Sequence, residues 1–270
     1  MRRLITLAVA LLALSACGED AGGIVLPSDP EAPVIQIRSE GGFAPIEQMY
    51  SSGPTYTLLG GGRLIYEGPV IMIYPGPLLP NTQVTEVTDE QMSEILAMVE
   101  EIGLPDMVSE HDDSAADDVA DATTEVITFW DDDGEHVYSV YALGIDTDPV
   151  PATAAAVELV NVLSAAASTG VSDEYTGDRV RIIAGVSQTA PEPGFEDIRP
   201  WPLAGEDPAR WEQLDLGFSC KVFGPETIEP FGDATQVTQW LHPDPMMDAP
   251  PFTLMVRYLH PGEPDCPVGG

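Results

Sequence analysis

Basic residues are scarce in this chain of 270 residues: ten lysines and arginines stand against 45 aspartates and glutamates, and Lys221 is the only lysine. A formal net charge of −35 repels the phosphates of nucleic acids and anionic lipid headgroups. The composition therefore excludes nucleic acid as a partner. A saline habitat and a GC-rich coding bias both deplete lysine, and in either case the acidic charge first predicts a solvated surface.

Histidine and cysteine, which often carry catalysis and metal binding, are also few: the chain has four histidines and three cysteines. No two histidines have the spacing of metal ligands on one helix. The sequence lacks a G-x-x-x-x-G-K-[ST] phosphate loop, a C-x-x-C pair, a complete dinucleotide fingerprint and a G-x-S-x-G turn. It therefore assigns no catalytic residue, no cofactor and no metal ligand. A pair of carboxylates that acts as general acid and base remains an open alternative, because 45 acidic residues make some spatial pairs inevitable.

Two acidic segments have carboxylates that could bind calcium. An EF-hand loop needs an acidic first position and a glycine at the sixth. With Gly134 at the sixth position, Phe129 stands first, so the pattern fails. We therefore predict a hairpin turn over residues 131–134. Whether the acidic loop from Asp112 to Asp121 binds cations stays open.

The most specific motif lies at the N-terminus. Arg2 and Arg3 precede an apolar run over residues 4–14, and Leu14-Ser15-Ala16-Cys17 closes the segment with small residues and a cysteine. The run is too short for a membrane-spanning helix, which needs about 20 apolar residues, and its flanks are those of a secretory leader. The closing motif resembles the lipobox of bacterial lipoprotein signal peptides.

This resemblance implies a lipid-anchored protein outside the cytoplasm. Residues 1–16 would be a cleaved signal peptide, and the diacylated Cys17 would anchor the chain to the bacterial cell membrane. Two acyl chains are enough for stable anchoring. Cleavage leaves eight basic residues against 45 acidic ones, a net charge of −37. The alternative is an ordinary secretory peptide whose cysteine is incidental.

With Cys17 assigned to the anchor, Cys220 and Cys266 remain. Exported compartments permit disulfides, so we predict one bridge between these two residues; two free thiols are the alternative. The bridge would hold a C-terminal tail that otherwise frays.

Composition also predicts the domain organisation. Residues 17–33 are rich in glycine, proline and acids, which predicts a flexible spacer behind the anchor. Loop-like sequence at 170–176 marks a boundary. We expect an N-terminal α+β domain over 34–170 and a C-terminal α+β region over 171–270 that contains the disulfide.

Two helices are well specified. Over 88–103, Thr88 and Gln91 form a capping-box pattern, apolar residues recur on one face, and Gly103 suits the C-terminal cap. An alanine-rich helix is expected over 151–167, with Pro151 in its first turn and Gly170 after its end.

Turn residues and β-branched runs predict two hairpins. One pairs 56–59 with 63–66 across three glycines, and the other pairs 125–130 with 136–142. Further strands are expected at 34–38, 70–74, 179–184, 220–223 and 252–258, and a strand or helix at 235–241. The sequence thus predicts an α+β fold: antiparallel hairpins with two main helices packed on the sheet, plus a smaller disulfide-closed C-terminal region.

Apolar residues also collect in the proline-rich segment 74–80, and Trp201 and Trp211 lie in loop-like sequence. Exposed, such groups form an interaction ridge; buried, they pack on the core. We expect packing for all three.

Short motifs in the body resemble uncharacterised actinobacterial envelope lipoproteins. The motifs are 41–45, 57–63, 74–80, His136 with 141–143, and the two late cysteines. Such chains often carry aspartate where Gly61 stands. The resemblance implies a place in the cell and no reaction or ligand.

Our first hypothesis is a non-enzymatic, lipid-anchored envelope protein that binds a partner or stabilises surface structure. Besides the membrane that holds its N-terminus, an envelope protein or a cell-wall component is the expected partner. The alternatives are an extracytoplasmic hydrolase using carboxylates and a solute-binding lipoprotein that serves a transporter. The last would need parallel two-lobed sheets, which the hairpins disfavour.

Overall fold

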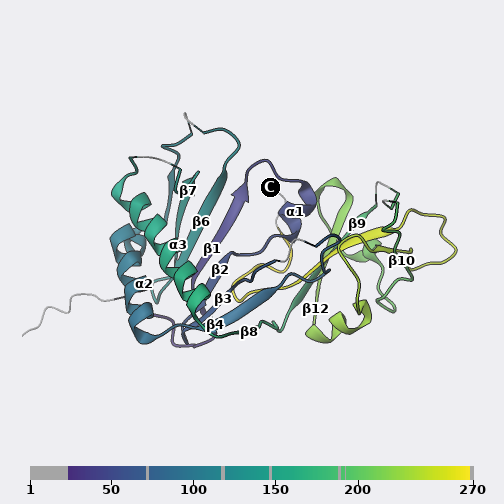
Figure 1. The fold of residues 1–270 in the computed structure, drawn as a ribbon, viewed down its shortest axis with the longest axis horizontal. Coiled ribbons are helices and arrows are strands. Elements are labelled where there is room, and N and C mark those ends of the chain that lie inside the picture. Colours follow the sequence, from purple (N-terminus) through teal and green to yellow (C-terminus); the bar gives the residue numbers. More distant parts are fainter. Residues whose placement is uncertain are drawn as a thin grey trace, which may run out of the picture.

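The computed structural model describes residues 24–70, 73–116, 119–145, 148–187, 190–191 and 193–267. The expected signal peptide, the anchor Cys17 and the first part of the expected spacer lie outside these residues. The second part of the expected spacer, residues 24–33, is held against the first sheet rather than flexible: Ile24 and Leu26 pack on its core, and the Asp132 N–H donates to the Val25 carbonyl oxygen (3.0 Å). Within the described residues the chain forms two mixed β-sheets with helices packed on them (Figure 1). The predicted α+β class is confirmed.

The strands and helices have the following bounds. The first sheet, in the order β5-β7-β6-β1-β2-β3-β4-β8, contains β1 (Pro33–Gly41), β2 (Tyr56–Leu59), β3 (Arg63–Glu67), β4 (Thr82–Glu86), β5 (Ser109–Asp112), β6 (Thr123–Trp130), β7 (Glu135–Tyr141) and β8 (Ser172–Glu174). The second, in the order β10-β13-β14-β9-β12-β11, contains β9 (Val180–Val186), β10 (Ile198–Arg199), β11 (Glu212–Gln213), β12 (Phe218–Phe223), β13 (Gln239–Trp240) and β14 (Phe252–Tyr258). The α-helices are α1 (Ile46–Ser51), α2 (Asp89–Ile102) and α3 (Pro151–Thr169), and short 3-10 helices are η1 (Leu104–Asp106), η2 (Pro208–Arg210), η3 (Asp215–Gly217) and η4 (Pro225–Phe231).

α2 begins and ends where the sequence predicts. The Gln91 N–H donates to the Thr88 hydroxyl (3.2 Å) and the Thr88 N–H donates to the Gln91 side chain (2.8 Å), which completes the capping box. Gly103 follows with a φ of +83°, a left-handed conformation that glycine adopts at little cost. The capping interactions predicted at both ends of this helix are therefore present.

α3 lies beside α2, and both cover one face of the first sheet (Figure 1). Among the described residues, α3 is the helix whose length and apolar composition would let it cross a membrane. Leu159 and Leu163 are fully buried in the core that α3 shares with α2 and the sheet. Packing on the sheet thus accounts for its apolar character.

Both predicted hairpins form. β2 and β3 pair across the three glycines, with Gly62 at a φ of +83°. β6 and β7 pair across residues 131–134, where an Asp131 carboxylate oxygen accepts the N–H groups of Asp133 (2.9 Å) and Gly134 (3.1 Å). Most strand pairs are antiparallel, but β5 runs parallel to β7 and β10 to β13, so both sheets are mixed.

The strand predicted over 70–74 is wrong for the described residues 70, 73 and 74, which lie in irregular backbone; residues 71–72 lie outside the described part. The place beside β3 is taken by β4 instead. The chain turns away after β3, where the Gly68 N–H donates to the carbonyl oxygen of Asn81 (2.7 Å). Pro69 and Pro75, which flank the segment, have no N–H for a strand ladder.

The second sheet has its own apolar core on one face, around Trp240, Leu254 and Val256. Trp201 and Trp211 pack there with ring centroids 6.0 Å apart, and Leu78 reaches the same core from the proline-rich segment. The expectation that these groups are packed is confirmed.

The predicted disulfide is confirmed. Cys220 on β12 is bonded to Cys266 in the C-terminal tail, with 5.9 Å between the two Cα atoms. Cys220 is almost fully buried beside Phe218 and Ile183. The bridge therefore fixes the tail to the second sheet.

The segment that follows β14 joins the two sheets. Nδ1 of His260 lies 2.9 Å from the Thr57 hydroxyl on β2, and Gln36 on β1 donates to the Pro261 carbonyl oxygen (3.3 Å). The Tyr175 hydroxyl donates to the Leu259 carbonyl oxygen (3.0 Å). His260 is 2% exposed, and burial lowers its pKa to about 4, with Arg257 nearby acting in the same direction and Glu263 opposing.

Replacing both cysteines with serine (Cys220→Ser with Cys266→Ser) is expected to lower the free energy of unfolding by about 3–4 kcal/mol. The bond joins residues 46 positions apart and restrains the unfolded chain. Urea unfolding in oxidising buffer measures the loss. Wild-type chain under reductant is the control and should unfold at the midpoint of the double variant; equal midpoints for oxidised wild type and variant would contradict the prediction.

His260 is expected to make the fold acid-sensitive. An unfolded histidine titrates at about pH 6.5, so the buried neutral imidazole contributes stability that is complete above that pH and is lost as the pH falls toward 4. Over this interval the wild-type free energy of unfolding should fall by about 3 kcal/mol more than that of His260→Gln. Urea unfolding at both pH values measures the difference, and His242→Gln, at a histidine that is only partly buried, is the matched control. Parallel pH dependence of wild type and His260→Gln would count against the prediction.

Candidate functional site

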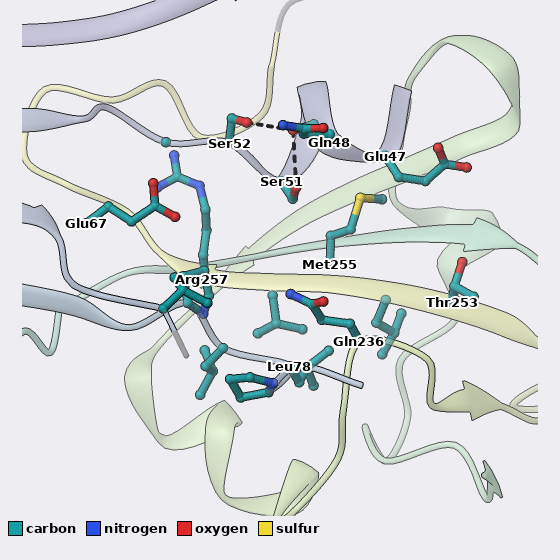
Figure 2. Close-up of a pocket in the computed structure, with 18 of the residues that line it drawn as sticks. Glu47, Gln48, Ser51, Ser52, Glu67, Leu78, Gln236, Thr253, Met255 and Arg257 are labelled. Atoms are coloured by element: carbon teal, nitrogen blue, oxygen red, sulfur yellow. Dashed lines mark hydrogen bonds between the residues drawn. The ribbon is translucent and has the colours of Figure 1, made fainter. Parts of the chain in front are cut away.

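A cavity of about 1810 Å³ lies between the two sheets (Figure 2). We call it the inter-sheet cavity. One wall consists of α1 and residues 52–55, a second of residues 253–257 on β14, and a third of residues 76–82. The elements that form it are therefore distant in sequence and meet only in the folded chain.

The lining of the inter-sheet cavity is largely apolar, with polar groups on the α1 side. Apolar lining residues include Ile73, Leu78, Leu79, Phe218, Leu254 and Met255. Figure 2 shows Gln48, Ser51 and Ser52 on the side of α1, and Gln236 with Leu78 on the other side of β14. The cavity thus offers one apolar wall and one wall with hydrogen-bonding side chains.

Two backbone hydrogen bonds to a segment distant in sequence place the third wall. The Gln236 N–H donates to the Gly76 carbonyl oxygen (3.1 Å), and the Leu78 N–H donates to the Ala234 carbonyl oxygen (3.2 Å). Prolines at 75, 77 and 80 keep the segment from joining a sheet ladder. These two bonds therefore hold it against the second core while its other side borders the cavity.

Two buried arginines and one glutamate form a cluster of which Arg257 lines the cavity; we call Arg181, Arg257 and Glu263 the arginine cluster. Arg257 forms a buried ion pair with Glu263, whose other carboxylate oxygen accepts the His260 N–H (2.8 Å). Arg257 also donates to the Tyr258 carbonyl oxygen (3.2 Å). A Cβ at residue 53 would overlap the Arg257 guanidinium, so the glycine allows the loop after α1 to lie directly on it.

Arg181 completes the cluster. It donates to the carbonyl oxygens of Tyr50 (3.3 Å) and Ser52 (3.5 Å). Burial, with the charge of Arg257 nearby, lowers its pKa to about 10. The cluster thus ties the loop after α1 to both β9 and β14.

The hydrolase hypothesis requires a carboxylate pair or an accessible histidine in a concave site. Glu47 and Glu67 line the cavity, but Figure 2 shows them at opposite sides of it. His260 also lines it, yet its ring is buried and neutral, and its partner Thr57 is fully buried. These lining groups therefore fit general acid–base chemistry poorly.

A serine and a histidine meet in a second hollow of about 510 Å³ on the first sheet. Nδ1 of His111 lies 2.8 Å from the Ser139 hydroxyl, on neighbouring strands. The Ser139 hydroxyl donates to the carbonyl oxygen of Glu110 (3.2 Å). The Glu110 carbonyl oxygen therefore competes with the histidine for the serine proton, which does not favour an activated nucleophile.

The acidic segments singled out in the sequence have structural partners. The Asp112 carboxylate accepts hydrogen bonds from the Thr153 hydroxyl and the Ser114 N–H, and the Thr153 bond is the main cause that lowers the Asp112 pKa. The carboxylates of Asp131, Asp132 and Asp133 gather at the β6–β7 turn. In the loop from Asp112 to Asp121, residues 117–118 lie outside the described part.

His136 holds the same turn. Its Nε2 lies 3.0 Å from Asp131 and its Nδ1 2.6 Å from the Met107 carbonyl oxygen. Burial lowers the pKa of His136, but these two acceptors outweigh burial, so its pKa is raised overall. Two acceptors favour the doubly protonated ring, which makes His136 a structural residue of the hairpin.

Sequence reasoning identified part of this site. The proline-rich segment 74–80 was singled out as an apolar collection, and it forms a cavity wall. Arg257, Glu263 and His260 were missed, because nothing in their spacing shows that β14 and the tail are buried together. Cys17, the predicted anchor, lies outside the described residues.

Comparison of the chain with protein-family models, with curated proteins and with solved structures finds no match.

Proposed function

We propose that this chain is a lipid-anchored protein of the bacterial envelope that binds a largely apolar ligand in the inter-sheet cavity. The observation that carries the proposal is the cavity itself, about 1810 Å³ between two sheets. Ligand sites in proteins are typically clefts of about 300–1,000 Å³ with mostly apolar linings and a few placed polar groups. The cavity has this chemistry and more than this volume.

The proposed anchor comes from the sequence and complements the cavity. The lipobox-like motif at Cys17 would hold the body close to the outer face of the membrane, because the chain already packs on the first sheet from Ile24 onward. A body with a net charge of −37 after cleavage is repelled by anionic headgroups. The anchor therefore keeps the cavity near the membrane without the body lying on it.

Binding has better support than hydrolysis. The carboxylates that line the cavity come from α1 and the end of β3 and lie on opposite sides of it. The lining histidine is neutral and buried. By contrast, the apolar wall formed by Leu78, Leu254 and Phe218 needs no further group to hold an apolar ligand.

Filling the cavity is expected to weaken binding of an apolar probe. Gln236→Trp places an indole where Gln236 lines the cavity, and the affinity for Nile red should fall at least tenfold, about 1.4 kcal/mol. Fluorescence titration of the chain in phosphatidylcholine nanodiscs, above the signal of empty nanodiscs, measures it. Asn161→Trp, exposed on α3, adds the same indole away from the cavity and should leave the affinity unchanged. Equal affinities for the two variants, or no binding by wild type, would refute the proposed site.

Cys17→Ser is expected to abolish the lipid anchor. Without the sulfur no acyl chain can be attached, and anchoring by acyl chains is lost. Labelling of a bacterial culture with an alkyne fatty acid should mark the wild-type chain and leave the variant unmarked, and Ser15→Ala is the control that keeps the cysteine. Unlabelled wild-type chain would show that the N-terminal segment is an ordinary secretory peptide.

A further inference from the structure

The two edges of β14 are used unequally. Along one edge β14 pairs with β9 over its full length, Phe252–Tyr258. Along the other it pairs with β13 only at Phe252 and Thr253. The chain before β13 turns aside, because the Thr238 N–H donates to the Thr235 carbonyl oxygen (3.0 Å). Within the described part of the chain, most of the second edge therefore has no strand partner; we call this stretch the open edge, and Leu254 and Val256 on it are each 3% exposed.

The hydrogen-bond pattern identifies the backbone groups on this open edge. The Ser187 N–H donates to the Pro251 carbonyl oxygen (2.8 Å) and the Leu259 N–H to that of Arg179 (2.9 Å), so odd-numbered residues of β14 face β9. In an antiparallel ladder the intervening residues point the other way. The C=O of Leu254 and the N–H and C=O of Val256 thus face the open edge, and no residue in the described part of the chain bonds to them.

The open edge lies inside the inter-sheet cavity. Five consecutive residues, 253–257, line the cavity, whereas a strand presenting one face would contribute only alternate residues. Figure 2 shows β14 crossing the cavity, with Met255 on the α1 side and Leu78 on the other. Backbone groups that are shielded from water and unpaired are costly, so a ligand that bonds to them is favoured over one that offers only apolar contact.

Building on the binding function proposed above, we propose that the cavity takes an extended segment of another polypeptide, which adds to β14 as a further strand of the second sheet. Strand addition supplies backbone hydrogen bonds for affinity and pockets for alternate side chains for specificity. The open groups of Leu254 and Val256 are the partners for the incoming backbone. The ligand is thus a peptide rather than a lipid.

The walls determine the side-chain pattern of that segment. Residues on one face of the incoming strand meet the apolar wall at Leu78 and Leu79, and those on the other face meet Gln48, Ser51 and Ser52. Successive strand residues point to opposite faces. The segment therefore alternates apolar and polar residues.

The charge around the cavity determines which residues should flank the extended segment. Glu47 and Glu67 lie exposed on opposite sides of the cavity (Figure 2). The one arginine among the lining residues, Arg257, is already paired with Glu263. The chain as a whole carries a net charge of −35. Basic residues on either side of the extended segment complement this field.

The test uses the chain in phosphatidylcholine nanodiscs and a labelled peptide with the sequence acetyl-Lys-Val-Thr-Val-Thr-Val-Lys-amide. Fluorescence anisotropy should show saturable binding, and the peptide should displace Nile red from the cavity. A peptide with glutamate in place of both lysines should bind at least tenfold more weakly. Equal affinity of the two peptides would overturn the charge argument.

Backbone methylation isolates the strand addition without altering the protein. One peptide carries N-methyl groups on its valines and another on its threonines, which block opposite edges of the incoming strand. One of the two should lose at least tenfold in affinity and the other should keep it. Amide hydrogen exchange should also slow at Val256 when the unmodified peptide binds, while Met255 and Arg257, which face β9, change little. Unchanged affinity for both methylated peptides, or no slowing at Val256, would overturn strand addition.

The outcomes separate this inference from the function on which it rests. Nile red binding without peptide binding would overturn the peptide ligand and leave an apolar ligand in the cavity. Binding of neither probe would overturn both proposals.

Discussion

The buried ion pair between Arg257 and Glu263 is the interaction on which the arrangement of the two sheets depends. Both side chains are 7% exposed, and removing one partner of such a pair leaves an unpaired buried charge at a cost of about 3–5 kcal/mol. The Glu263 carboxylate also accepts a hydrogen bond from the backbone N–H of His260. Arg179 donates to the carbonyl oxygens of His260 and Glu263. The pair thus shapes the tail that contacts the first sheet.

The tail after β14 also shows where the two sheets touch and where they separate. The sheets are joined through the tail after β14, where His260 meets Thr57 and Tyr175 meets Leu259. Along the middle of β14 the second sheet instead faces α1 and the proline-rich segment, and the inter-sheet cavity lies there. Contact at one end of β14 and separation along its middle follow from one short stretch of sequence.

Much of the fold could be predicted because its signals are local. The capping box at Thr88, the glycines at 60–62 and the turn at 131–134 each specify an element within a few residues. β5 and β8 gave no such signal, because both are short and mostly exposed, so no apolar period marks them. The apolar run at 70–74 predicted a strand that its described residues do not form, because apolar residues are common in a cavity wall as well as in a strand.

The candidate site could be predicted only in part. The proline-rich segment carries a compositional signal, but its place opposite β14 depends on hydrogen bonds between residues 76–78 and 234–236, which are distant in sequence. The open edge of β14 is equally invisible, because it results from where the chain before β13 turns. A disulfide could be predicted by counting the cysteines, whereas the sequence does not show whether the ion pair between β14 and the tail is buried or solvated.

The position of the disulfide has a consequence for when the protein reaches its final form. Cys266 lies three residues beyond Glu263, so the bond to β12 secures the stretch of tail that supplies the glutamate to Arg257. Thiols stay reduced in the cytoplasm and are oxidised outside it. For a chain exported as we propose, maturation of the tail is therefore deferred until after translocation, which keeps the precursor less compact while it must still be threaded across the membrane.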